Sequence, residues 1–348
     1  MRSPLSKALV ALASLTLLGA CSGQATTSSA SSSSQPESST AATAPEATAS
    51  PAAAAEAVTF PLTVASRDGE VTIPKRPERI VVVDMAALDT LDAIGAGDRV
   101  VGTVGTSVPS WLKDAEGIDY STLPKIGSVK ELDQEAIAKL NPDLIILGAR
   151  NDAAVGAELA KNWTTINAGV TWAEGNYSQK VAANVQMVAD AVGERAKGAE
   201  AAKKITDALN NHQDTAKSKG TAMVLMTNAD ELSVHGKNSR WAPIYDVFGF
   251  QEAMDTTPDE GHKAKSISFE TVKETDPDYI FVVDRAKAIG QTDGVTPAEQ
   301  LLDNDLVNST KAARNGHIVY LTPERWYVVM AGAGNFLAEL DEIAAAIK

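Results

Sequence analysis

Two arginines occupy matched positions in an internal repeat of the sequence. Residues 135–150 and 270–285 align without a gap at an offset of 135, and both copies carry Glu, Pro, Asp, Ile and Arg at the same places. Each copy predicts a short helix, a Pro-Asp stop and an apolar strand, with Arg150 or Arg285 just beyond the carboxyl end of the strand. In open α/β sheets, ligands bind outside the carboxyl ends of the strands. We therefore expect Arg150 and Arg285 to face one crevice from two similar lobes.

A third arginine stands in a comparable setting. Arg240 lies in a segment, residues 233–241, that predicts the end of a strand and a turn leading into a helix. A guanidinium group stays protonated, and its planar fork of N–H donors suits anionic oxygens. Three such cations around one cleft would make an anion site in a protein whose net charge is −14. The pattern alone leaves open whether Arg240 contacts a ligand or is a solvated surface residue.

Two further side chains could bind iron at the same edge. His262 lies in a polar loop ahead of the second repeat copy, and Tyr327 lies just past the last predicted strand. Imidazole and phenolate groups are both ligands of ferric iron in proteins. An aromatic residue after a strand also packs in cores, so the spacing leaves both interpretations open. The other histidines, His212, His235 and His317, are expected on a helix surface, beside the Arg240 turn and in a turn, respectively.

The composition excludes several classes of function. With 45 Asp and Glu against 31 Lys and Arg, the chain lacks the basic excess of a nucleic-acid binder. One cysteine cannot build a disulfide framework or a cysteine-based zinc cluster. The sequence contains no G-x-S-x-G, no H-E-x-x-H and no P-loop motif. It therefore predicts a binding protein without a permanently bound cofactor, and not an enzyme.

The amino terminus predicts an export signal followed by a tether. Arg2 and Lys7 precede a short apolar run that ends in small residues, the pattern of a secretory signal over residues 1–20. The only cysteine, Cys21, stands where a bacterial lipobox needs one, and the segment resembles a lipobox. We expect this residue to carry lipid and to anchor the protein to a membrane. The rest of residues 21–57 has no aromatic or branched aliphatic side chain, which predicts a disordered tether.

The remaining chain predicts an α/β fold in two lobes. Short β-branched runs alternate with helical stretches, which is typical of parallel strands buried on both faces. The two repeat copies indicate two similar lobes, each a mainly parallel sheet with flanking helices. We expect an N-terminal lobe at residues 58–193, one long linking helix at 194–219 and a C-terminal lobe at 220–348. The predicted strand runs are residues 80–83, 144–147, 223–226, 279–283 and 318–321.

Residues 58–348 resemble the substrate-binding lipoproteins of ABC importers for ferric siderophores, a helical-backbone family that also binds haem and vitamin B12. The similarity is greatest to the catecholate-siderophore binders. It is carried by residues 81–95, 127–150, 232–240, 266–285 and 302–327. The resemblance implies that Arg150, Arg240 and Arg285 surround the catecholate oxygens. It also implies that His262 and Tyr327 complete the iron shell when the siderophore supplies only four donors.

The same resemblance implies roles for residues outside this cluster. Glu135 and Glu270, one in each repeat copy, would meet arginines of the permease dimer, and the alternative is an ordinary acid at a helix N-terminus. Trp241 and Trp326 are expected to pack on the catecholate rings. The sequence departs from the family pattern in two places. The loop that follows His262 is one residue longer, and an arginine precedes the Trp-Tyr pair where a tyrosine is common.

Together these features predict a monomeric receptor, lipid-anchored on the outer face of the cell membrane. It would bind a ferric catecholate siderophore between its lobes and deliver it to an ABC permease for iron uptake. The nearest alternative is a haem receptor, in which His262 and Tyr327 would be axial ligands and the arginines would meet the propionates. From a different class, a surface enzyme or an adhesin remains an alternative.

Overall fold

The first of the two large sheets consists of four short parallel strands. The structure, a computed structural model, describes residues 58–105, 108–113, 115, 117–172, 175–257 and 264–348, all of which belong to one compact unit. The strands lie in the order β4-β3-β5-β6, and nearly all of their side chains are buried, as expected of apolar strands covered on both faces. An antiparallel hairpin, β1 (Leu62–Ser66) and β2 (Gly69–Ile73), precedes them. The sheet strands are β3 (Ile80–Val82), β4 (Val100–Thr103), β5 (Leu144–Leu147) and β6 (Thr165–Asn167).

The second sheet is mixed. Its strand order is β10-β8-β7-β11-β12, and β9 also pairs with β7. The strands β7, β11 and β12 are parallel, whereas β8 pairs antiparallel with both β7 and β10. The predicted α/β architecture with two lobes is therefore confirmed, with antiparallel strands at one edge of the second sheet. Its strands are β7 (Thr221–Asn228), β8 (Glu231–His235), β9 (Gln251–Glu252), β10 (Lys265–Ile267), β11 (Tyr279–Asp284) and β12 (Ile318–Tyr320).

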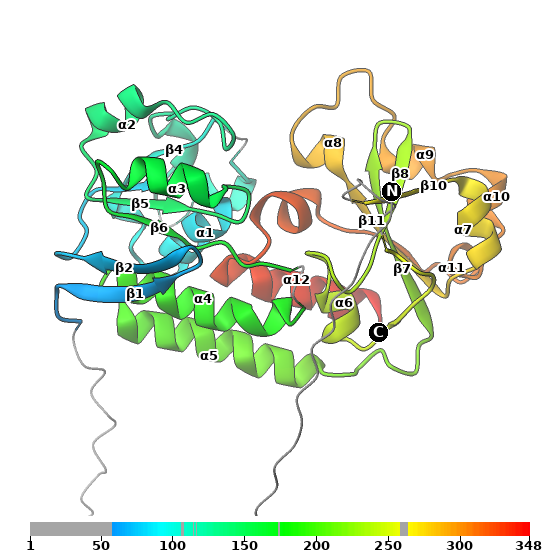
Figure 1. Ribbon diagram of the computed structural model, residues 1–348. Helices are drawn as coiled ribbons and strands as arrows, with labels where there is room; N and C mark the ends of the chain where they lie inside the picture. The colour runs from blue at the N-terminus through cyan, green and yellow to red at the C-terminus, as the bar shows by residue number, and fades with distance from the viewer. Residues whose placement is uncertain (1–57, 106–107, 114, 116, 173–174, 258–263) are drawn as a thin grey trace, which may run out of the picture. The chain divides into compact units, whose positions relative to one another are not determined.

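Helices flank both sheets (Figure 1). In the N-terminal lobe they are α1 (Met85–Ala93), α2 (Gln134–Leu140), α3 (Ala153–Leu159), and the short 3₁₀ turns η1 (Gly97–Arg99), η2 (Ser110–Leu112) and η3 (Tyr120–Thr122). In the C-terminal lobe they are α6 (Pro243–Asp246), α7 (Phe269–Thr275), α8 (Arg285–Ala288), α9 (Ala298–Leu301), α10 (Asp305–Asn308), α11 (Lys311–Arg314), the π-helical turn η4 (Arg325–Val329), and α12 (Ala333–Ala346).

The repeat found in the sequence folds into the same structure twice. Each copy is a seven-residue helix, α2 or α7, that ends in a left-handed residue and is followed by a Pro-Asp pair and a buried strand. The aspartates, Asp143 and Asp278, perform the same task. Asp143 accepts a hydrogen bond of 2.9 Å from the Arg79 N–H at the start of β3, and Asp278 accepts one of 2.9 Å from the Thr221 N–H at the start of β7. Each carboxylate thereby joins its strand to the neighbouring parallel strand.

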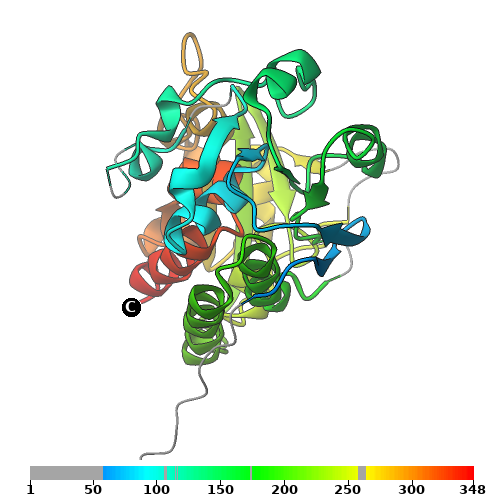
Figure 2. The ribbon, with the colours of Figure 1, turned by 90° about the vertical axis from the view of Figure 1, so that its left-hand side faces the viewer.

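The connection between the lobes is a pair of helices that lie side by side, α4 (Tyr177–Ala191) and α5 (Arg195–His212) (Figures 1 and 2). The close approach requires a glycine in α5, because a Cβ atom at Gly198 would lie 2.2 Å from the Ala189 side chain. The linking helix ends at His212, seven residues before the end predicted at residue 219. The reason is tertiary: the N–H groups of Asp214 and Ala216 donate to the carbonyls of Val247 and Phe248 instead of continuing the helix.

Packing crosses the boundary that the sequence places at residue 193. Val181 and Val185 of α4 belong to the core formed by the second sheet, whereas Val188 on the same helix belongs to the core of the first. In the reverse direction, Val328 and Val329 of η4 pack in the core of the first sheet. The two lobes therefore share hydrophobic contacts through α4 and through the segment that precedes α12.

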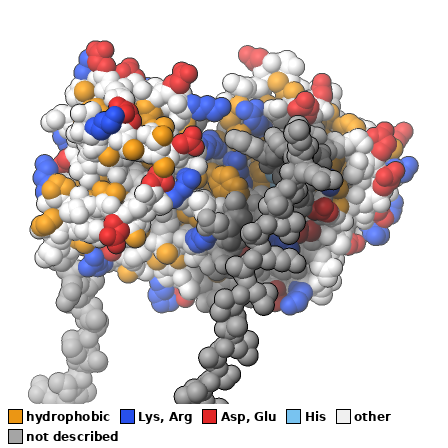
Figure 3. Space-filling view, viewed as in Figure 1, with side chains coloured by type: hydrophobic (Ala, Val, Ile, Leu, Met, Phe, Trp, Pro, Cys, Tyr) orange, Lys and Arg blue, Asp and Glu red, His pale blue; other side chains and the backbone are white. Residues whose placement is uncertain are grey.

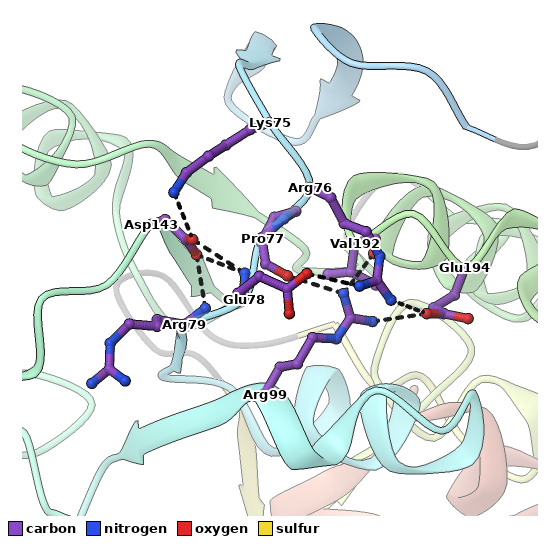
Figure 4. Close-up of polar contacts among 9 residues, drawn as sticks. All are labelled: Lys75, Arg76, Pro77, Glu78, Arg79, Arg99, Asp143, Val192 and Glu194. Carbon is purple, nitrogen blue, oxygen red and sulfur yellow. Dashed lines mark hydrogen bonds and ion pairs between the residues drawn. The ribbon is translucent and has the colours of Figure 1, made fainter.

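A buried arginine fixes the turn between α4 and α5 to the first sheet (Figure 4). Arg99 is 6% exposed, and it donates to the carbonyl oxygens of Pro77 and Val192 at 3.0 and 2.8 Å and to the Glu194 carboxylate at 3.1 Å. Glu194 also accepts a bond of 2.8 Å from Arg76, which is about half exposed. The linking helices are therefore anchored to the N-terminal lobe.

We expect Arg99→Ala to lower the free energy of unfolding by about 2 kcal/mol, since buried hydrogen bonds to a charged group contribute about 1.5–3 kcal/mol. Arg76→Ala is the matched control: its exposed ion pair with the same Glu194 should contribute less than about 1 kcal/mol. Urea unfolding of the two variants measures the difference. Equal losses in both variants would show that Arg99 is no more important than a surface charge.

Candidate functional site

Three arginines surround the side chain of one tyrosine. Tyr327 lies in the π-helical turn η4, a rare conformation that occurs often at functional sites. The guanidinium carbons of Arg150, Arg240 and Arg285 lie 5.3, 5.2 and 5.7 Å from the centroid of its ring. Figure 3 shows basic side chains gathered where the surface is hollowed between the two lobes. The structure thus brings together the four residues, as the sequence predicts.

The positions of the arginines follow from strand ends. Arg150 lies in the turn three residues after β5, Arg285 directly follows β11, and Arg240 lies between β8 and α6. The carboxyl ends of β5 and β11 belong to different sheets, so Arg150 comes from the N-terminal lobe and Arg285 from the C-terminal lobe. Both parallel strands run toward the same region, which is why the repeat delivers two cations to one place.

Two of the arginines already use N–H donors within the protein. Arg285 donates from Nε to the Tyr327 hydroxyl at 2.9 Å and from Nη1 to the Asn228 side-chain oxygen at 2.7 Å. Arg150 donates from Nη2 to the Tyr327 backbone carbonyl at 2.5 Å, and this contact joins the lobes. A cavity of about 510 Å³ lies beside Arg285 and Asn228. A second cavity, of about 580 Å³, lies between β1 and α4, and none of the three arginines lines it.

Arg240 differs from the other two. Its Nη1 atom is buried and has no hydrogen-bond partner among the described residues. Aromatic rings surround its guanidinium carbon instead: Trp172 at 5.1 Å, Trp241 at 5.2 Å and Tyr327 at 5.2 Å. Burial and the charge of Arg150 lower the pKa of Arg240 to about 10, so it remains a cation at neutral pH. A half-buried cation with an unsatisfied buried donor attracts an anionic oxygen strongly.

The two tryptophans expected to pack on a ligand are both buried. Trp326 is 1% exposed, its ring lies in the core of the second sheet, and its indole N–H donates to Glu342 at 2.7 Å. Trp241 is also 1% exposed and packs against the ring of His235, with centroids 4.2 Å apart. In this structure neither ring is exposed, so stacking of either on a ligand stays a prediction that would require them to be uncovered. Trp241 contacts the Arg240 guanidinium instead, at 5.2 Å.

Two residues of the site were missed in the sequence. Trp172 follows β6 and is only half-buried, and Asn228 is the last residue of β7. Both lie at or shortly after the carboxyl end of a strand, so the rule that led to Arg150 and Arg285 could have identified them. Nothing in the local pattern of residue types around either position distinguishes it from an ordinary loop residue.

Other predicted site residues lie elsewhere or outside the described chain. Cys21 and His262 lie outside the described residues. Glu135 and Glu270 are exposed in the first turns of α2 and α7, which Figure 1 shows in different lobes, and Glu135 forms an ion pair of 2.7 Å with Lys139. Within the described part of the chain, no group of three or more His, Cys, Asp or Glu side chains is placed to hold a metal ion. No helix of that part is long and apolar enough to cross a membrane.

The histidine beside Arg240 makes folding stability depend on pH. Burial, with a smaller contribution from the charge of Arg240, lowers the pKa of His235 to about 3. The unfolded chain binds a proton at this side chain below about pH 6.5, but the folded protein does not, so stability falls as the pH decreases through this window. We expect the wild type to lose about 1 kcal/mol per pH unit relative to His235→Gln between about pH 6 and pH 4. Urea unfolding at several pH values tests this prediction. The control, His212→Gln, should show the same pH dependence of the unfolding free energy as the wild type. An unfolding free energy of His235→Gln that changes with pH in parallel with the wild type would contradict it.

Comparisons with known proteins agree with this architecture. The family model described as "Periplasmic binding protein" matches residues 80–325. The petrobactin-binding protein YclQ of Bacillus subtilis is 32% identical over 78% of this chain and 83% of its own length. Its crystal structure superimposes with a TM-score of 0.74 and 30% identity, covering 82% of this chain and 98% of the other.

Two further relatives belong to the same group. The catecholate-siderophore binding protein VctP of Vibrio cholerae has a TM-score of 0.71 and 29% identity, covering 80% of this chain and 99% of the other. A B. subtilis protein named as a putative ABC transporter substrate-binding lipoprotein, YhfQ, is 27% identical over 80% of this chain and 87% of its own. These relatives are binding proteins. The chain therefore belongs to the periplasmic binding protein family and is a binding protein rather than an enzyme.

Proposed function

We propose that this protein binds a ferric catecholate siderophore at the arginine cluster and delivers it to an ABC permease for iron uptake. The observation that carries the proposal is the cluster itself: Arg150, Arg240 and Arg285 converge on Tyr327, and a buried Nη1 of Arg240 has no partner among the described residues. An anionic ligand oxygen would supply that partner. The names of two relatives, a petrobactin binder and a catecholate-siderophore binder, support the same ligand class.

The chemistry of the ligand matches the charges of the cluster. A catechol that binds Fe(III) is deprotonated, so the ferric complex presents several anionic oxygens on planar rings. Arginine donates in a planar fork to such oxygens, and each hydrogen bond to a charged group contributes about 1.5–3 kcal/mol. Rings that lie around guanidinium groups can also pack against an aromatic ligand. Tyr327, and His262 from outside the described residues, remain proposed iron ligands for a siderophore with only four donors.

The same proposal covers the position of the protein in the cell. Cys21 would carry the lipid, residues 21–57 would be the tether, and a monomer would operate at the outer face of the membrane. Glu135 and Glu270 would contact the permease, one from each lobe; both are exposed, as this role requires. A relative named as an ABC transporter substrate-binding lipoprotein supports the anchor and the transporter.

The test is a parallel equilibrium titration of the purified protein with three iron compounds. A ferric bis-catecholate, a ferric hydroxamate and haemin are each added while tryptophan fluorescence is recorded. Sub-micromolar binding of the catecholate alone is the expected result. Binding of haemin alone, with a Soret band lost in Tyr327→Phe, would replace the proposal with a haem receptor. No binding of any of the three would contradict both.

A further inference from the structure

We propose that Trp172 is a positioning residue for Arg240: its indole holds the guanidinium group in place without using an N–H donor that the ligand needs. The inference rests on the proposed function and adds a residue that the sequence analysis did not select. Trp172 lies in the loop between β6 and α4, after the last strand of the first sheet. Arg240 follows β8 of the second sheet. Their contact, with the guanidinium carbon 5.1 Å from the indole centroid, therefore joins segments that follow different sheets, and Trp172 packs beside Arg240 on the core of the second sheet.

The geometry of a guanidinium group explains why an aromatic partner suits this task. All five N–H donors lie in the plane of the group, so an aromatic ring over its face restrains the side chain without consuming a donor. An acidic partner would hold the arginine equally well but would neutralise it and occupy its fork. The cation–π attraction contributes up to about 2 kcal/mol when the pair is desolvated. This is enough to order a long side chain before the ligand arrives.

Arg285 in the same cluster illustrates the contrast. Two of its nitrogens donate to Tyr327 and Asn228 at 2.9 and 2.7 Å. For Arg240, the structure gives three ring contacts and a buried Nη1 without a partner among the described residues. The Nη1 donor of Arg240 is therefore available to a ligand, and the three aromatic rings hold the side chain in place.

The origin of the three rings gives Trp172 a distinct role. Trp241 is the neighbour of Arg240 in the sequence, and Tyr327 packs against the cores of both sheets. Trp172 comes from the loop that follows the first sheet, and it packs, half-buried, against the core of the second sheet. The position of the Arg240 guanidinium, and with it the affinity of the site, therefore depends on how the loop between β6 and α4 packs against the second sheet.

A double-mutant cycle tests the inference. The affinity for a ferric bis-catecholate is measured by equilibrium dialysis, with detection by the absorbance of the ferric complex, for the wild type, Trp172→Ala, Arg240→Ala and the double variant. We expect Trp172→Ala to weaken binding about 10-fold in the wild type, which corresponds to the loss of one cation–π contact. In the Arg240→Ala background it should have no further effect. Because the effect of Trp172 passes through Arg240, the two losses should not add.

Three further variants separate positioning from simple packing. Trp172→Phe keeps an aromatic face and should recover most of the affinity, whereas Trp172→Leu fills the space without a π face and should not. Trp163→Ala, at a half-buried tryptophan that packs against the core of the first sheet, is the matched control. It should lower the melting temperature without changing the affinity.

Each other outcome has a definite meaning. Wild-type affinity in Trp172→Ala overturns the inference, and so does equal recovery by Phe and Leu. An equal loss in the Arg240→Ala background also overturns it, because Trp172 would then act on the ligand without Arg240. If Arg240→Ala itself binds like the wild type, the proposed function fails instead, which keeps the two failures distinguishable.

Discussion

Arg240→Ala is expected to weaken binding of a ferric catecholate about 100-fold, which corresponds to about 2.7 kcal/mol. The reason is that Arg240 is half-buried and positively charged, and its buried Nη1 has no partner among the described residues. The ligand supplies the missing hydrogen bond, and it does so in surroundings that screen charge poorly. The free protein gains little compensation, since the rings around Arg240 do not replace a hydrogen bond. Equilibrium dialysis with the ferric complex measures the effect.

Variants of the other arginines show how large the effect of Arg240 on the affinity should be in comparison. Arg285→Ala should cost about 10-fold, because two of its donors already bind Tyr327 and Asn228. Arg240→Lys keeps the charge but not the fork and should lie between Arg240→Ala and the wild type. Arg314→Ala, at an exposed arginine at the end of α11, is the control and should bind normally. An Arg240→Ala protein with wild-type affinity would contradict the assignment of the cluster as the ligand site.

Asp89→Ala is expected to lower the free energy of unfolding by about 4 kcal/mol, because it leaves three donors without a partner. Asp89 is 4% exposed and lies in α1 of the N-terminal lobe. It accepts hydrogen bonds from the backbone N–H groups of Gly334 and Asn335 at 2.8 and 2.9 Å and from the Trp111 indole at 3.3 Å. It thereby caps the N-terminus of α12, a helix that follows the second sheet.

The cap also affects the site. Asn335 donates to the carbonyls of Met330 and Arg325 at 2.8 and 3.2 Å, and these residues bracket the π-helical turn that carries Tyr327. A displaced α12 should therefore shift Tyr327 and weaken ligand binding as well as folding. Thermal and urea unfolding give the stability, and the same dialysis experiment gives the affinity.

Two comparisons make this prediction specific. Asp133→Ala removes an exposed cap of α2 in the same lobe and should lower the free energy of unfolding by only about 1 kcal/mol.

Asp89→Asn tests the effect of the charge of Asp89. Burial raises the pKa of Asp89 to about 6, so the folded wild type takes up a proton between about pH 6 and pH 4 that the unfolded chain does not bind. The wild type should gain stability relative to Asp89→Asn as the pH falls through this window. For Asp89→Ala, a decrease in the free energy of unfolding of less than about 1 kcal/mol would refute the capping role.

Much of the architecture can be predicted because it depends on local patterns. The runs of buried β-branched residues mark five of the strands, and the two repeat copies are sufficient to indicate two lobes. The repeat also places Arg150 and Arg285 correctly, since the carboxyl end of a strand is a feature that the sequence displays directly. Tyr327 is identified for the same reason, as it follows the last parallel strand.

Other features cannot be predicted because they depend on contacts between distant segments. The helix predicted to end at residue 219 stops at His212, since the residues that follow bond to the segment at 247–248, and no local signal reveals that partner. Trp326 is buried by the core around α12 and bonds to Glu342, so its position after a strand is misleading. Periodicity describes which face of an element is apolar, but not which neighbour covers it.

The division between the two kinds of information is clearest at Arg240. Its residue type and its place after a strand are visible in the sequence, and so is its capacity to bind an anion. Its distinguishing property is that three aromatic rings enclose it and that one buried nitrogen has no partner among the described residues. One of those rings, Trp172, lies 68 residues away along the chain, after a strand of the other sheet. Local sequence sets the charge and the propensity of each residue, but only the packing of distant segments against one another decides which donors remain available to a ligand.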